Sequence, residues 1–316
     1  MYVHLFIWGF TMTDGIDLFS GGGGTTEGAT AAGVKILWAA NHKQSVVDTH
    51  MINHPNTLHS CQDLQQADWS LVPKHDILYA SPCCQAHSLA AGAARNSLKA
   101  DLSRSTAWAV VSCLEAHRSK GALIENVPEF LSWILFPAWK MAIEALNYSL
   151  SFNLVNLAPL GGPQNRKRLI IAITPSKNPI ELELPDREIG TARSIVDLSM
   201  EPYKWDDVSN RVKATQLRVA NGRKKYGEVF LDASYGSARC GRSLDKPLGT
   251  VTTINKHSLV IGDKIRPLSL SELSLAQTFS PNYVWPKGKT LSKAMIGNAV
   301  PPLMAKEVTL AFLRAA

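Results

Sequence analysis

The sequence places two adjacent cysteines, Cys83 and Cys84, on a loop that follows a short apolar run ending at Ala80. Such a run is typical of a buried strand, and open α/β sheets carry their chemistry on the loops that leave their strands. A thiol becomes a strong nucleophile once it loses its proton, so this loop is a candidate for covalent catalysis. A buried and inert cysteine pair is the alternative.

Three further charged residues stand beside predicted strands. Glu125 follows the predicted strand 122–124, where a carboxylate next to a cofactor cleft can act as an acid or as a hydrogen-bonding group. Arg166 and Arg168 precede the predicted strand 169–173 and offer positive charge for contacts with an anion or a base. A solvated loop carboxylate and a solvated strand edge are the alternatives for these residues.

The elements that must position these residues alternate between strand and helix in the first half of the chain. This alternation predicts an α/β fold with a parallel sheet and right-handed crossovers. The predicted strands are 15–20, 35–40, 76–80, 122–124, 152–157 and 169–173, and the predicted helices are 25–32, 44–52, 101–117, most of 129–149, 270–278 and 303–315.

A glycine-rich turn, 21–24, follows the first predicted strand. Glycines allow positive φ and a close approach of the backbone to a ligand, and the N–H groups of the next helix can face that ligand. The turn lacks the G-x-x-x-x-G-K-[ST] pattern of a triphosphate site. Asn41, at the end of the second strand, lies where Rossmann-like folds bind a ribose. Asp63 could accept from an adenine amino group or cap the next turn.

Composition bounds the class of protein. The chain has 316 residues, of which 45% are hydrophobic and 19% charged, as expected for a globular protein with a sizeable core. A formal net charge of +7 favours a polyanionic partner. Five cysteines without a C-x-x-C spacing argue against a disulfide framework and a zinc site, so we expect a reducing cytosol and no metal.

The opening ten residues are apolar but lack the basic region and the small-residue cleavage site of a signal peptide, and they are too short to span a membrane. Met12 offers a second start, so residues 1–11 are either an extra strand or an extension.

The character of the sequence changes from about 178 to 256, where apolar runs become fewer. Within this stretch, segment 211–225 has six positive charges and no acid, so as a helix it would present a basic face to phosphates. An ordinary soluble helix is the alternative. A regular pattern then returns, which indicates that the middle of the chain is an insertion.

Taken in order, six motifs resemble those of the DNA (cytosine-5) methyltransferase family, and together they cover nearly the whole chain. They are Asp17-Leu18-Phe19-Ser20-Gly21-Gly22-Gly23, Pro82-Cys83-Cys84-Gln85, Glu125-Asn126-Val127, Gln164-x-Arg166-x-Arg168, Arg266-Pro267-Leu268 with Glu272 and Gln277-x-Phe279, and Gly297-Asn298-Ala299-Val300-Pro301.

The resemblance implies a mechanism. Addition of the Cys84 thiolate to C6 of cytosine makes C5 able to take a methyl group from S-adenosylmethionine. Cys84 is assigned because it directly precedes Gln85, whereas Cys83 occupies a position that is often proline in the family. Glu125 would hold N3 and the exocyclic amine of the base. Arg168 would contact O2, Arg166 would support the cysteine loop, and Asn126 would be structural.

The resemblance also implies that the target base is flipped out of the duplex, because C5 is otherwise unreachable. Ser88 and Arg104 would lie in the loop that closes over the flipped base. For the cofactor, the implied contacts are Phe19 on the adenine ring, Asp63 on its amino group, and Asp17, Gly21, Gly22, Gly23, Pro82 and Asn298 around the methionine part. Asn41 departs from the family, which usually has an acidic residue there to bridge the ribose hydroxyls.

By resemblance, residues 1–183 and 256–316 form a Rossmann-like catalytic and cofactor-binding domain, and 184–255 form a small inserted target-recognition domain. The expected partner is double-stranded DNA, with Arg211, Arg223, Lys224 and Lys225 among its contacts. A restriction endonuclease of the same site is a candidate second partner, and we expect a monomer in the cytoplasm of a bacterial or phage-infected cell. A tRNA cytosine-5 methyltransferase and a catalytically silent DNA-binding relative are the alternative functions.

Overall fold

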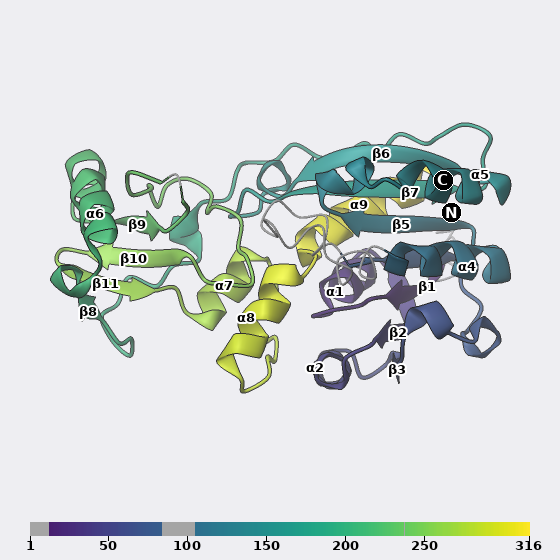
Figure 1. Ribbon diagram of the computed structural model, residues 1–316, viewed down its shortest axis with the longest axis horizontal. Helices are drawn as coiled ribbons and strands as arrows, with labels where there is room; N and C mark the ends of the chain where they lie inside the picture. Colours follow the sequence, from purple (N-terminus) through teal and green to yellow (C-terminus); the bar gives the residue numbers. More distant parts are fainter. Residues whose placement is uncertain (1–12, 84–104, 237) are drawn as a thin grey trace, which may run out of the picture.

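The computed structural model describes residues 13–83, 105–236 and 238–316, and it has a large and a small lobe (Figure 1). The large lobe is built on a seven-stranded sheet of order β3-β2-β1-β4-β5-β7-β6. Its strands are β1 (Thr13–Leu18), β2 (Val34–Asn41), β3 (Leu58–Cys61), β4 (Ile77–Ala80), β5 (Gly121–Asn126), β6 (Ser149–Asn156) and β7 (Lys167–Thr174).

The strand–helix alternation correctly predicts the parallel pairing of β1 with β2 and β4, and of β4 with β5. Strand β3, which is not among the predicted strands, also pairs parallel with β2. The alternation does not predict the direction of β7, the predicted strand 169–173, which pairs antiparallel with both β5 and β6. The physical reason is the short link between β6 and β7, since a crossover helix is needed to join parallel neighbours and a short loop joins antiparallel ones.

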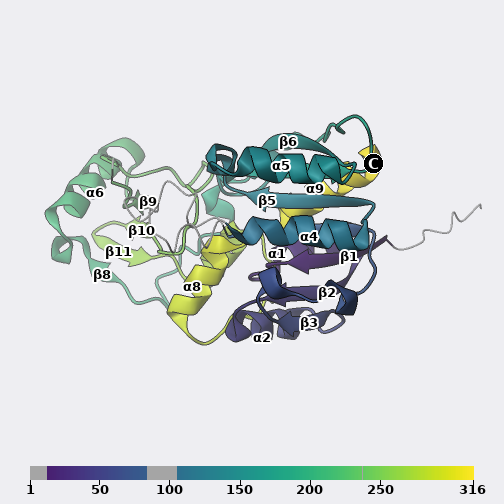
Figure 2. The same cartoon turned by 45° about the vertical axis from the view of Figure 1, so that its right-hand side comes forward.

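Helices cover both faces of the large sheet. On one face, α4 (Trp108–His117) and α5 (Phe136–Ala145) pack over a core that includes Trp139 and Leu114. On the other face, α1 (Gly24–Ala31) and α9 (Pro302–Ala315) pack over a core that includes Phe312 and Val308. The last helix therefore packs on the large lobe beside α1, and the result is a three-layer α/β/α arrangement (Figure 2).

Helix α2 (Gln44–Asn53) lies beside β2 and β3 at one end of the large sheet. The stretch 129–149 is predicted to be mostly helical and divided near Pro137 into a short and a longer piece. The structure has a short 3-10 turn, Pro128–Ser132, followed by α5, with Pro137 in its first turn, where the missing N–H costs no hydrogen bond. Strand β6 already begins at Ser149.

The small lobe holds a four-stranded antiparallel sheet of order β8-β11-β10-β9. Its strands are β8 (Asp206–Asp207), β9 (Val229–Ala233), β10 (His257–Ile261) and β11 (Lys264–Pro267), and the neighbouring helices are α6 (Lys213–Tyr226), α7 (Leu270–Ala276) and α8 (Lys289–Asn298). The small sheet extends beyond residue 255, the predicted end of the inserted domain, because strands β10 and β11 complete it.

The two faces of the small sheet differ in what covers them. Helix α6 packs on one face through Val219, against Phe230 and Val260. Figures 1 and 2 both show α6 at the end of the molecule that is farthest from the large lobe. The other face shares a core with α7 and α8, which join the small lobe to the large one.

Candidate active site

The sheet topology brings the predicted site residues to one edge. Parallel strands β1, β2, β4 and β5 all end there, and the antiparallel strand β7 begins there. Ligands of open α/β sheets bind outside this edge. The glycine turn, the chain entering the cysteine loop, Glu125 and Arg168 therefore lie along one rim, although the sequence runs from residue 21 to residue 168 between the first and the last of them.

The turn after β1 has the backbone geometry that its glycines suggest. Gly21 has a φ of 52°, and an added Cβ would meet only the Phe19 carbonyl oxygen, at an ordinary contact distance of 3.7 Å, so this peptide can face a ligand. Gly23 has a φ of 82°, and an added Cβ would overlap the Tyr283 hydroxyl and the His54 ring. The Tyr283 hydroxyl also donates to the Gly22 carbonyl oxygen, so the inner side of the turn is fixed by protein contacts. Phe19 precedes the turn with a φ of 61° and is half-buried.

Asp17 is fully buried at the end of β1. Its Oδ2 accepts a hydrogen bond of 2.8 Å from Thr26 Oγ1, whereas its Oδ1 has no hydrogen-bond partner within the described residues. Burial raises the pKa of this carboxyl to about 7, because desolvation outweighs the hydrogen bonds from Thr26. A buried carboxylate with one free oxygen is suited to an ammonium group, and the methionine part of S-adenosylmethionine carries one.

Asn41 and Asp63 both make local hydrogen bonds that still leave them able to take their predicted roles. Asn41 is buried and its Oδ1 accepts from Lys43 N at 3.1 Å, next to the start of α2. Asp63 is exposed, and its Oδ1 accepts from Gln65 N at 3.0 Å, which caps a short turn. Each oxygen has a second lone pair, so these contacts do not prevent contact with a ribose or an adenine amino group.

The chain that enters the cysteine loop is held on both sides. Asn126, fully buried at the end of β5, donates from Nδ2 to the Pro82 carbonyl at 3.2 Å and accepts from Val127 N at 2.9 Å. The Cys83 N–H donates to Thr106 Oγ1 at 3.0 Å. Asn126 thus has the structural part expected of it. The predicted nucleophile Cys84, with Ser88 and Arg104, lies outside the described residues.

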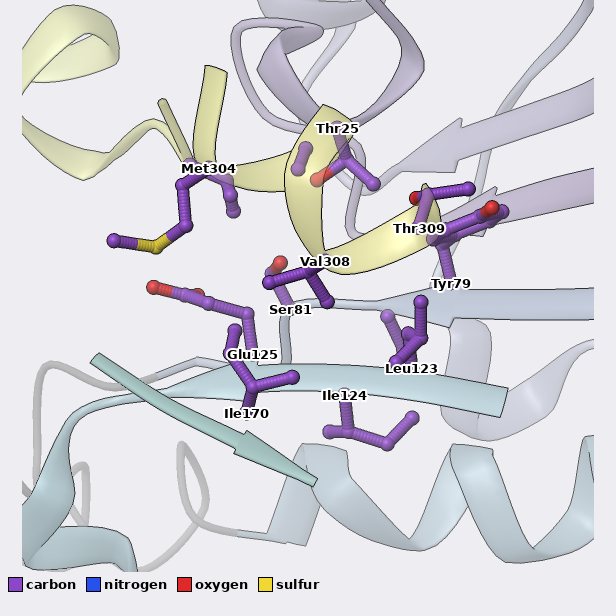
Figure 3. Close-up of a pocket in the computed structure, with 13 residues that line it drawn as sticks. Thr25, Tyr79, Ser81, Leu123, Ile124, Glu125, Ile170, Met304, Val308 and Thr309 are labelled. Atoms are coloured by element: carbon purple, nitrogen blue, oxygen red, sulfur yellow. The ribbon is translucent and has the colours of Figure 1, made fainter. Parts of the chain in front are cut away.

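Glu125 and Arg168 form an ion pair across neighbouring strands β5 and β7, with 2.9 Å between Arg168 Nε and Glu125 Oε1. Each side chain is 13% exposed, so the pair is held in place and still open to a ligand at the rim. Glu125 also lines a narrow and mostly apolar cavity between the sheet and α9. Figure 3 shows it entering from β5, with Ser81 near it and Met304 and Val308 of α9 opposite.

Arg166 is buried and is held by carbonyl oxygens of two distant segments. Nη1 donates to Val251 at 3.0 Å, and Nη2 donates to Gly297 at 3.0 Å and to Ala299 at 2.8 Å. Asn298, between the last two, is exposed at the end of α8. Arg166 therefore fixes the turn that presents Asn298, which places both motifs at one structural junction.

The cations that the sequence assigns to DNA differ in their surroundings. Arg223 pairs with Asp263 at 2.8 Å and Glu228 at 3.3 Å, and Arg211 lies 3.4 Å from Asp206. These acids come from turns and strands outside the basic segment, so its local sequence could not show them. Lys224 and Lys225 are exposed at the end of α6.

Sequence reasoning missed a group of cations around Tyr235. Arg242 and Lys256 lie over its ring, 5.4 Å and 5.7 Å from the centroid. The Tyr235 hydroxyl donates to the Thr250 carbonyl at 2.8 Å, and Thr250 Oγ1 donates to the Asn165 carbonyl at 2.8 Å. This group, named here the Tyr235 cluster (Tyr235, Arg242 and Lys256), is thus linked directly to the segment that leads to Arg168. Only the aromatic and basic residue types in 234–256 hinted at it.

Within the described residues, no helix is both long and apolar enough to cross a membrane.

The chain is similar to known methyltransferases over nearly its whole length. The chain is 26% identical to the type II methyltransferase M.MthTI of Methanothermobacter thermautotrophicus, over 92% of this chain and 94% of that protein. It is 29% identical to the type II methyltransferase M.HgiDI of Herpetosiphon aurantiacus, over 92% and 91%.

Among solved structures, the Entamoeba histolytica methyltransferase EhMeth matches with a TM-score of 0.71 at 15% identity, over 96% of this chain and 98% of that one. The Dnmt2 methyltransferase of S. pombe matches with a TM-score of 0.65 at 16% identity, over 96% and 98%. At these identities the structural matches show the fold alone. The profile of C-5 cytosine-specific DNA methylases matches residues 13–314, and the chain therefore belongs to that family.

Proposed function

We propose that this DNA cytosine-5 methyltransferase attacks C6 of a flipped cytosine with the thiolate of Cys84. The observation that supports this most strongly is the Glu125–Arg168 pair, which stands on the rim strands next to the chain that enters the cysteine loop. An acid and a guanidinium at one rim suit the ring nitrogen and the carbonyl of a cytosine. Cys83, whose N–H is bound by Thr106, remains the alternative nucleophile.

In the proposed reaction, addition of the thiolate to C6 pushes electrons into the ring and makes C5 nucleophilic. Glu125 favours this step by holding a proton at N3 as negative charge develops in the ring, and Arg168 orients Glu125 while offering donors to O2. After methylation, loss of the C5 proton and of the thiolate restores the aromatic base. Asn126 and Arg166 act by fixing the backbone of the rim.

S-adenosylmethionine is the proposed cofactor, and it supplies an electrophilic methyl group on a sulfonium. Phe19 would pack on its adenine, Asp63 and Asn41 would accept hydrogen bonds from its adenosine part, and Asp17 would hold its ammonium. Gly21, Gly22, Gly23, Pro82 and Asn298 would line the methionine part. The unpartnered Oδ1 of Asp17 and the open side of Gly21 support this placement.

For DNA, we propose that the Tyr235 cluster and the exposed Arg239 contact the phosphates beside the flipped base, because the cluster is linked to the catalytic rim through Thr250 and Asn165. Residues 184–255, together with β10 and β11, would serve as the target-recognition part. Arg104 and Ser88 would close over the base. Arg211, which precedes α6, and the α6 cations Arg223, Lys224 and Lys225 would add long-range attraction.

The biological setting is also a proposal. The curated relatives are named type II methyltransferases, which supports a restriction endonuclease of the same site as the second partner. We propose a monomer acting in the cytoplasm of a bacterial or phage-infected cell.

A duplex with 5-fluorocytosine at the target position tests the covalent step. Fluorine replaces the C5 proton that must leave, so the enzyme should stay attached to the DNA after methyl transfer. We expect a denaturant-resistant complex with the wild-type protein and with Cys83→Ser, and none with Cys84→Ser. A complex that persists in Cys84→Ser and is lost in Cys83→Ser would instead identify Cys83 as the nucleophile.

A further inference from the structure

A chain of hydrogen bonds runs beneath the glycine turn from Asp17 towards the surface. Thr26 Oγ1 lies 2.8 Å from Asp17 Oδ2, and His50 Nε2 lies 3.1 Å from Thr26 Oγ1. His59 Nε2 then lies 2.8 Å from His50 Nδ1. The first three residues are buried and His59 is half-buried. Because the four residues come from β1, α1, α2 and β3, the fold itself assembles this chain.

The chain can run in two directions, because a hydroxyl and an imidazole each donate and accept. When Asp17 is ionised, Thr26 donates to it, His50 Nε2–H donates to Thr26, and His59 Nε2–H donates to His50 Nδ1. When Asp17 carries a proton on Oδ2, every bond can reverse and His50 takes its other tautomer. The hydrogen bond on Oδ2 is therefore kept in both states of the carboxyl.

The groups around Asp17 are uncharged near neutral pH. Burial holds the pKa of His50 well below its usual value, and the pKa of His59 is also lowered, mainly by desolvation. Burial also raises the pKa values of the Tyr79 and Tyr283 hydroxyls, and the charge of Asp17 raises them further. Within the described residues, Asp17 therefore has no cationic partner, and its Oδ1 has no hydrogen bond.

We propose that Thr26, His50 and His59 are positioning residues that hold Asp17 through Oδ2 and so reserve Oδ1 for the ammonium group of the cofactor. This inference rests on the proposed function, which places the methionine part beside Asp17. The bound ammonium supplies the missing positive charge and selects the ionised carboxylate. The proton that leaves Asp17 passes to Thr26, which passes its own to His50 Nε2. His50 then passes its Nδ1 proton to His59 Nε2, and His59 releases its other ring proton to solvent.

Calorimetric titration with two ligands tests the positioning role. S-adenosylhomocysteine keeps the ammonium group, whereas 5′-methylthioadenosine lacks the amino-acid part. We expect Thr26→Val to weaken S-adenosylhomocysteine binding about tenfold while 5′-methylthioadenosine binding changes less than about twofold, since one charge-assisted hydrogen bond is lost. Thr26→Ser, which keeps the hydroxyl, should bind both ligands as the wild type does.

Equal weakening of both ligands by Thr26→Val would show a merely structural role and overturn the inference, as would unchanged S-adenosylhomocysteine binding. If Thr26→Val does not fold, the pair His50→Gln and His50→Phe serves instead. Glutamine can place its Nε2 donor near Thr26 and should retain selectivity for the ammonium ligand, whereas phenylalanine should lose it. Phenylalanine with full selectivity would contradict the inference.

Proton release gives a second readout that packing does not affect. Titration with S-adenosylhomocysteine at pH 7, in two buffers of different ionisation enthalpy, should show release of a fraction of a proton by the wild type and none by Asp17→Asn. Wild-type binding without proton release would contradict the inference. If the wild-type protein binds neither ligand, the proposal that S-adenosylmethionine is the cofactor would itself be contradicted.

Discussion

Arg168 on β7 and Glu125 on β5 form an ion pair of 2.9 Å at the rim of the large sheet, and each side chain keeps 13% of its surface exposed. The antiparallel pairing of the two strands creates this relationship, since it brings the start of β7 beside the end of β5. The pair leaves Glu125 oriented and accessible, which is the arrangement that a proton-holding carboxyl requires.

Replacing Glu125 with glutamine should lower the rate of methyl transfer by a factor of about 10² or more, because an amide cannot hold the proton at N3. DNA affinity should change far less. Single-turnover kinetics and a binding titration with the same duplex measure both quantities, with Glu115→Gln on the exposed surface of α4 as the matched control. A Glu125→Gln protein that transfers methyl groups at the wild-type rate would contradict the assignment.

Replacing Arg166 with methionine should destabilise the protein by about 1–3 kcal/mol or more, because three buried carbonyl oxygens lose their donors together. Urea unfolding measures the change. The control is Arg193→Met, which breaks an exposed pair with Asp245 and should lower the free energy of unfolding much less. Equal effects of the two substitutions would show that the junction at Val251 and Gly297 does not depend on Arg166.

Removing positive charge from the Tyr235 cluster should flatten the salt dependence of DNA binding. Each lost phosphate contact lowers the slope of log K against log salt by about 1. We expect the double variant Arg242→Ala with Lys256→Ala to lose more slope than Lys224→Ala with Lys225→Ala, because α6 lies at the far end of the small lobe. A larger loss of slope from the Lys224→Ala with Lys225→Ala variant would show that the basic segment 211–225, rather than the Tyr235 cluster, contacts the phosphates.

The raised pKa of Asp17, about 7 against a model-compound value of 3.8, has a consequence for stability. The native state binds this proton more tightly than the unfolded state, so the contribution of Asp17 is greatest at low pH. It should decline as pH rises from about 4 to about 7 and stay level above that. Unfolding of the wild type and of Asp17→Asn across this range measures the difference, which would be independent of pH if the carboxyl were ionised throughout.

The sequence predicts the large lobe well because its motifs follow strands. Short apolar runs such as 76–80 and 169–173 mark buried strands. The residues that follow the parallel strands meet at one rim, and Arg168 joins them because β7 runs antiparallel and begins there. Strand β3 escaped prediction because it is short and lies at the sheet edge with Leu58 exposed, so it lacks an apolar pattern.

Contacts between distant segments could not be predicted in this way. Nothing in the local sequence of 211–225 shows that Arg223 meets Asp263, because the turn that carries the acid is added by β10 and β11. The hydrogen bonds that join Thr26, His50 and His59 have the same origin, since helix α2 and strand β3 must first pack beside α1. Local sequence patterns predict which residues lie at the rim, whereas contacts between distant segments determine which side chains pair there.

Transfer of a labelled methyl group from S-adenosylmethionine, offered with duplex DNA and with tRNA in separate reactions, tests the central claim most directly. The account predicts label in 5-methyldeoxycytidine of the DNA, retained by Cys83→Ser and abolished by Cys84→Ser. Label found only in the tRNA, or label in DNA that survives Cys84→Ser, would contradict it.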